Sequence, residues 1–95
     1  MPIEEFIAKP VVVSAIQWTG DNLNEIKQFC NGLARYSSSK LVIETTEGSS
    51  TATVGDYIVR GTEGEFYPVK PRVMRNKYDL LKDKAKRIVD NLGLE

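Results

Sequence analysis

Residues 55–69 have the sequence GDYIVRGTEGEFYPV, and this stretch decides the fold class. Two runs rich in β-branched and aromatic residues, 57–60 and 65–69, lie on either side of a loop that contains two glycines. This arrangement predicts an antiparallel hairpin, with a positive φ at Gly61 in its loop. Asp56 is expected to form a hydrogen bond within its own turn. The fold therefore contains an antiparallel sheet.

The side chains of this hairpin alternate between the two faces of the predicted sheet. Phe66 and Tyr67 are neighbours in one strand, so one belongs to the core and the other is available for binding. Pro68 indicates an edge strand, because proline has no N–H to donate to a ladder. Glu65 is expected to pair with Arg60 across the loop, a contact that contributes about 0–1 kcal/mol when it is exposed.

Outside the hairpin, the same alternation predicts three more strands, over residues 9–18, 41–46 and 50–54. Both faces of the first strand are apolar, which favours a central position in the sheet. Downstream of the hairpin, Pro71 suits the first position of a short turn or helical segment. Residues 76–78 are placed as a returning strand.

A helix is predicted over residues 23–30, between the first two of these strands. Asn22 and Glu25 have the spacing of a capping box, and Asn31-Gly32 is typical of a left-handed helix end. The apolar residues share one face, which must pack on a sheet because so short a helix is unstable alone in water. They are Leu23, Ile26, Phe29 and Cys30. The predicted fold is thus α+β, an antiparallel β-meander of about five strands with one inserted helix packed on it.

A C-terminal amphipathic helix is predicted over residues 79–92, as an extension (79–95) of an α+β domain at 1–78. Its apolar stripe can close over the chain's own sheet, or pair with the same helix of a second chain. A third possibility is a membrane surface, although the stripe lacks Trp and Phe. A homo-oligomer would form through Leu81, Ala85, Ile88 and Leu92. The final Leu94-Glu95 is a dipeptide typical of a cloning remnant.

The composition argues against most classes of enzyme. Hydrophobic residues make up 41% and charged residues 27% of the chain, so it is expected to be globular rather than disordered. It has no His, which removes the commonest general base and metal ligand. Its single cysteine, Cys30, excludes an internal disulfide and is expected to be a buried structural thiol. We therefore assign no catalytic residue, no metal and no cofactor.

The charges balance overall but are unevenly placed. The chain has 13 basic and 13 acidic residues, which argues against a strongly basic nucleic-acid binder. Residues 70–95 carry eight of the basic residues and only four acids, so this part is expected to be solvated or to dock on an acidic surface. No apolar run approaches the ~20 residues of a membrane span, and the acidic N-terminus is unlike a signal peptide. A cytoplasmic location is expected.

Residues 55–71, with the sequence GDYIVRGTEGEFYPVKP, resemble a family of small phage and prophage proteins, the PGDYG-like proteins. We call this stretch the GDY–KP block. Family members usually begin with a Lys-Pro-Val strand that ends in Gln-Trp-x-Gly, which is matched by residues 9–11 and 17–20. The resemblance covers roughly residues 8–78. It implies a phage or prophage origin and a small cytoplasmic accessory protein in a bacterial host cell, and it implies no reaction.

Two positions depart from the family pattern. Val54 stands where the family often has proline, and Arg72 stands where the family tends to have aspartate after Lys-Pro. The second difference makes the local surface more basic. It puts in doubt any ligand that the family would bind through this turn.

Five residues are candidate ligand- or partner-binding positions. An exposed Tyr67 near Trp18 and Lys70 would form a patch for a ring or an anion, and Tyr57 and Arg72 would extend it. The first hypothesis is an accessory protein that contacts a protein partner through its sheet edge or terminal helix. The alternative is a small-ligand binder, for instance one that sequesters a nucleotide signal of host defence, with a concave aromatic and basic pocket. The third is a weak hydrolase, which would need converging polar groups.

Overall fold

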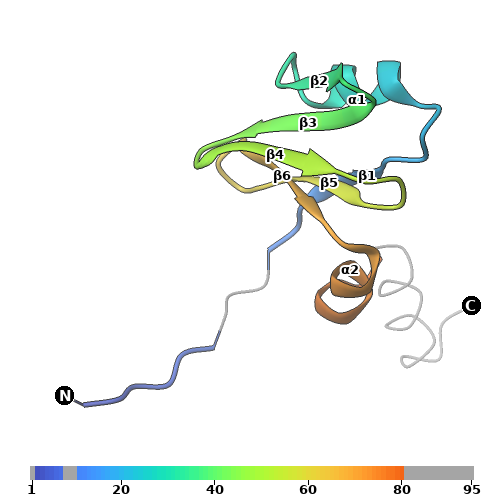
Figure 1. Ribbon diagram of the computed structural model, residues 1–95. Coiled ribbons are helices and arrows are strands. Elements are labelled where there is room, and N and C mark those ends of the chain that lie inside the picture. Colours follow the sequence, from blue (N-terminus) through green and yellow to red (C-terminus); the bar gives the residue numbers. More distant parts are fainter. Residues whose placement is uncertain (1, 8–10, 81–95) are drawn as a thin grey trace, which may run out of the picture.

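A computed structural model describes residues 2–7 and 11–80. Within these residues the fold is α+β, with six antiparallel strands in two three-stranded sheets and two short helices (Figure 1). The α+β class is confirmed, but the single five-strand meander is not, because the strands divide between two sheets. No helix in the described part of the chain is long and apolar enough to cross a membrane.

The first sheet is formed by β1 (Ser14–Gln17), β5 (Tyr57–Arg60) and β6 (Phe66–Val69), in the order β1-β5-β6. The predicted hairpin is the β5–β6 pair, in which Val59 lies opposite Tyr67. Strand β6 is an edge strand within its sheet, as Pro68 indicates. The central strand is β5 rather than the first strand, because β1 pairs on one side only.

The second sheet is formed by β2 (Ala34–Ser37), β3 (Lys40–Thr45) and β4 (Gly48–Ala52), in the order β2-β3-β4. Strand β2 is absent from the sequence-based prediction, because only Ala34 of its four residues is buried and no apolar alternation marks it. Its turn into β3 uses Ser38 and Ser39, whose φ angles are 51° and 63°. Two successive positive φ angles match the twist of a tight hairpin, although serine is an uncommon choice there.

The core lies between the two sheets, where β3 and β4 pack against β6. Phe66 is the inward member of its pair with Tyr67, at 2% exposure. Its ring meets Phe29 of the helix edge-on, with centroids 5.6 Å apart. The other buried members of this cluster are Trp18, Ile26, Cys30, Ala34, Leu41, Ile43, Ala52 and Ile58.

Helix α1 (Leu23–Phe29) contacts β2 and buries the predicted face. Cys30 is fully buried, and burial raises the pKa of its thiol to about 11, as expected for a structural thiol. The predicted capping box is wrong, because the Asn22 side chain makes no cap bond. Its Oδ1 accepts the Thr19 N–H and its Nδ2 donates to the Gln17 carbonyl, which fixes the turn before the helix instead. The helix ends as predicted, with φ of 53° at Asn31 and 88° at the next glycine.

The loop between β5 and β6 differs from the prediction in two respects. The positive φ of 83° lies at Gly64, whereas Gly61 is not in that region. Gly61 instead donates its N–H to the Glu65 carbonyl at 2.7 Å. The expected Glu65–Arg60 pair does not form. The Glu65 carboxylate accepts the Glu63 N–H, and the Arg60 guanidinium lies 5.0 Å from the centre of the Phe29 ring.

Helix α2 (Pro71–Lys77) begins with Pro71 in its first turn, where proline is favoured. The helix runs through residues 76 and 77, so the predicted strand at 76–78 is wrong. In Figure 1, α2 lies at the end of β6, away from β2 and β3. The predicted C-terminal helix, with Leu81, Ala85, Ile88 and Leu92, lies outside the described residues, and the domain boundary at 78/79 stays a prediction.

Candidate binding site

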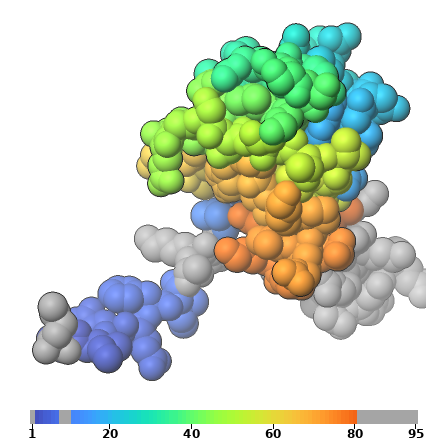
Figure 2. Space-filling view, viewed as in Figure 1, coloured from blue at the N-terminus to red at the C-terminus, as the bar shows by residue number. Residues whose placement is uncertain are grey.

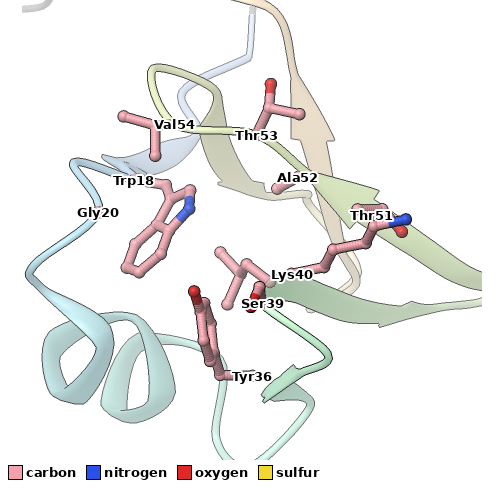
Figure 3. Close-up of a pocket in the computed structure, with 10 residues that line it drawn as sticks. Trp18, Gly20, Tyr36, Ser39, Lys40, Thr51, Ala52, Thr53 and Val54 are labelled. Carbon is pink, nitrogen blue, oxygen red and sulfur yellow. The ribbon is translucent and has the colours of Figure 1, made fainter.

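An open hollow of about 400 Å³ lies beside the indole of Trp18, between the end of β1 and the second sheet (Figure 3). We call it the aromatic hollow. Its volume is near the lower end of the ~300–1,000 Å³ typical of ligand pockets. It is lined by Trp18, Gly20, Tyr36, Ser39, Lys40, Leu41, Thr51, Ala52, Thr53 and Val54.

Trp18 is held in place by its backbone. Its N–H donates to the Asp56 carbonyl at 2.8 Å, and its carbonyl accepts the Gly55 N–H at 2.7 Å. The side chain is 4% exposed and belongs to the core. Among the described residues, no fully buried side-chain nitrogen or oxygen lacks a hydrogen-bond partner, and the indole Nε1 of Trp18 makes no hydrogen bond to any of these residues. This N–H is therefore open to solvent, and in Figure 3 it lies on the side of the ring that faces the hollow.

Tyr36 forms the opposite wall from strand β2. It is 50% exposed, and its ring centre lies 6.2 Å from that of Trp18 at an angle of 58° between the planes. The two rings are tilted and close, so a planar group cannot slide between them. Tyr36 lies opposite Leu41 in the sheet, and Leu41 is paired in turn with Ala52, which gives the hollow an apolar floor.

The rim of the hollow carries one cation, Lys40, at the start of β3. Its ammonium makes no ion pair with any residue that the structure describes. The lining includes hydroxyl groups but no carboxylate, thiol or imidazole. Within residues 2–7 and 11–80, no group of three or more Cys, Asp or Glu side chains is placed to hold a metal ion. The chemistry that this arrangement supports is binding, through apolar contact, ring contact and one positive charge.

The five predicted site residues are divided between separate places. Trp18 lines the hollow, in the core layer between the sheets. Tyr57 and Tyr67 are half-buried on the opposite face of the first sheet, because they alternate with the core residues Ile58 and Phe66. The predicted patch of Tyr67 beside Trp18 is therefore not assembled in one copy of the chain.

The other two candidates lie near α2. Arg72 is exposed on that helix. Lys70 precedes it, and its ammonium lies 3.0 Å from Oδ2 of Asp56, a carboxylate that is almost completely buried. The same Oδ2 accepts the Thr53 N–H at 3.0 Å, which confirms the predicted bond of Asp56 within its own turn. Lys70 also donates to the Thr53 hydroxyl at 3.2 Å.

This contact joins the two ends of the GDY–KP block. The Gly55-Asp56 turn meets Lys70-Pro71, and a Cβ at Gly55 would lie 3.8 Å from the Pro71 ring. Asp56 and Gly55 also hold the backbone of Trp18. The block therefore fixes one wall of the aromatic hollow, and its charged residues are used for structure.

Tyr67 has a neighbour of its own on the outer face of the first sheet. Its pKa is raised, first by burial and then by the neighbouring Tyr78 hydroxyl. Val59 lies opposite Tyr67 in the sheet and is fully buried. This outer face is thus partly closed by the chain itself.

Tyr36 and Lys40 are the site residues that the sequence-based prediction missed. Both flank the Ser38-Ser39 turn, in a segment without apolar alternation. The available signal was an aromatic residue in a polar segment followed by a lysine. Without a strand assignment, this signal is weak evidence for a binding site.

Comparisons of the chain with protein families, with curated proteins and with solved structures return no match.

Proposed function

We propose that this chain is an accessory binding protein of phage or prophage origin that acts through protein–protein contact at the aromatic hollow. The phage origin is supported by the resemblance of the GDY–KP block. The contact is supported by one observation above the others: Tyr36 is half-exposed over an apolar floor, and the rim carries Lys40, which extends toward Thr51 and makes no ion pair with any described residue (Figure 3). Exposed aromatic residues next to an apolar pocket are typical centres of protein interfaces.

The lining specifies the kind of segment that a partner would present. Leu41, Ala52 and the Trp18 ring favour an aromatic or aliphatic side chain, and the open Nε1–H of Trp18 can donate to a backbone carbonyl. Lys40 at the rim favours a carboxylate beside that side chain. The proposed partner segment is therefore an apolar anchor flanked by acidic residues.

The alternative function is the binding of a small ligand such as a nucleotide signal. It is favoured by the combination of Tyr36 and Lys40, because a base could stack on the exposed tyrosine ring while the ammonium contacts a phosphate. Lys40 is the one cation among the lining residues, which is a weak site for a polyphosphate, and Lys70, which donates to the lining residue Thr53, is paired with Asp56. We therefore place protein contact first.

A photocrosslinking amino acid at position 36 tests this function in bacterial cells. The matched control carries the same group at Glu47, an exposed residue of the β3–β4 turn. We expect a discrete crosslinked protein from position 36 and none from position 47, and the band should weaken in a Lys40→Glu background. Equal crosslinking from both positions would overturn the proposal. A small molecule retained by the wild-type chain in native mass spectrometry, and lost in Tyr36→Ala, would favour the alternative.

A further inference from the structure

The N-terminal arm, residues 2–7, exposes its large apolar side chains to solvent. Ile3, Phe6 and Ile7 are 93%, 86% and 96% exposed. In Figure 2 this segment, in dark blue, stands clear of the two sheets. Single exposed apolar residues are ordinary, but three within five positions form an unpartnered segment that gains by burial. The arm is therefore expected to bind an apolar surface, on this chain or on another molecule, that covers these side chains.

The arm has the chemistry that the aromatic hollow favours. Glu4 and Glu5 lie directly before Phe6, so the arm presents an aromatic anchor with adjoining carboxylates. The hollow presents an apolar floor and Lys40, whose charge is unpaired among the described residues. Val54, at the edge of the hollow, is itself 66% exposed and would be covered by the same contact.

We propose that the hollow binds the N-terminal arm of a second copy of this chain, with Phe6 on the apolar floor and the Glu4-Glu5 carboxylates beside Lys40. This inference rests on the proposed function, because it uses the same hollow and names a partner for it. Each copy carries one arm and one hollow, so two copies can exchange arms in a closed, twofold-symmetric dimer.

The direction of β1 favours a second copy over the chain's own arm. Strand β1 runs from Ser14 to Gln17 and leads directly into Trp18, so it carries the chain from the arm toward the hollow. The arm leaves from the opposite end of this strand (Figure 1). To reach its own hollow, the chain would have to reverse its direction between the arm and Ser14, whereas the arm of a neighbouring copy needs no such reversal.

The first test measures the mass of the full-length chain by analytical ultracentrifugation over a range of concentrations. We expect a monomer–dimer equilibrium that Phe6→Asp weakens at least ~10-fold, since an interface anchor is lost. Val12→Asp is the matched control, because Val12 is also an exposed apolar residue near the N-terminus but lies outside the arm. Its dimer should be as strong as that of the wild type.

Exchanging the charges of Lys40 and of the two arm glutamates tests whether these side chains are in contact in the dimer. Lys40→Glu should weaken the dimer, and Glu4→Lys with Glu5→Lys should weaken it as well. The triple variant that combines these changes should recover most of the lost affinity, because the attraction is restored with opposite signs. A dimer that resists Phe6→Asp, or a triple variant with no recovery, would overturn the inference.

Trp18 is the only tryptophan in the chain, so its fluorescence reports on the hollow directly. A synthetic peptide with the sequence PIEEFI, added to the full-length Phe6→Asp variant, should change the emission in a saturable way, and PIEEDI should not. A wild-type chain that stays monomeric at all concentrations would overturn the second-copy inference. Crosslinks from position 36 to another protein would then still support the proposed function, so the two failures are distinguishable.

Discussion

At the scale of single residues, Asp56 is the position whose burial most needs compensating hydrogen bonds. Its side chain is almost completely buried, and a buried carboxylate is costly unless it has strong partners. Here one oxygen accepts both the Thr53 N–H and the Lys70 ammonium. The Lys70 side chain is 62% exposed, so it supplies its charge while remaining largely hydrated. The pair therefore stabilises the turn that holds Trp18 without burying a second charge.

Replacing Lys70 by methionine is expected to lower the free energy of unfolding by about 1–2 kcal/mol, because the buried carboxylate loses its charged donor. Arg72→Met, at a neighbouring exposed cation, is the control and should change stability by less than ~0.5 kcal/mol. Urea denaturation followed by Trp18 fluorescence measures both. Equal effects of the two changes would show that the Asp56–Lys70 contact does not stabilise the fold.

At the scale of elements, the β5–β6 hairpin depends on one glycine of its loop, Gly64. Gly64 has a φ of 83°, and a Cβ placed there would meet no atom within 4 Å, so the requirement for glycine is conformational. Gly61 differs, because its backbone is not left-handed and an added Cβ would meet the Glu65 carboxylate. That carboxylate is the end of a flexible side chain and can move aside.

These two glycines should respond differently to the same substitution. Gly64→Ala is expected to lower stability by about 1–2 kcal/mol, because an L-residue is strained at this φ. Gly61→Ala should cost less than ~0.5 kcal/mol, since only a surface side chain has to shift. Thermal and urea denaturation of the two variants checks the order. A larger loss at Gly61 would mean that the loop has the conformation first expected from the sequence.

At the scale of the whole molecule, stability depends on the layer between the two sheets. Phe66 connects three elements there, because it extends from β6, meets Phe29 at the end of α1, and lies in the same cluster as Ile43 of β3. Strands β3 and β4 both pack on β6. The two sheets therefore share one core and are expected to unfold together.

Phe66→Ala should lower the free energy of unfolding by about 3–5 kcal/mol, because it removes a large side chain from a packed core. Val42→Ala, on the outer and half-buried face of β3, should cost less than ~1.5 kcal/mol. Native-state hydrogen exchange should show β3 and β5 losing protection together in the Phe66 variant. Loss confined to the first sheet would indicate two independent units.

The candidate site could be predicted from the sequence only in part. Trp18 is a predicted binding residue, and the structure places it both in the core and in the lining of the hollow. Tyr36 and Lys40 were missed because strand β2 has no alternation. The pairing of Lys70 could not be predicted, since no local pattern shows that Lys70 reaches a carboxylate 14 residues away.

The sequence by itself determined the elements whose cause is local. The β5–β6 hairpin, helix α1 with its glycine end, and the Pro71 start of α2 follow from side-chain alternation and from backbone preferences within a few residues. Tertiary structure alone decided how these elements are assembled. It decided the division into two sheets, the pairing of β1 with β5, and the backbone hydrogen bonds between Trp18 and the Gly55-Asp56 turn. The last two join residues about 40 positions apart. Such contacts form because the apolar face of each element is stabilised when another element covers it. The local sequence does not specify which element that is.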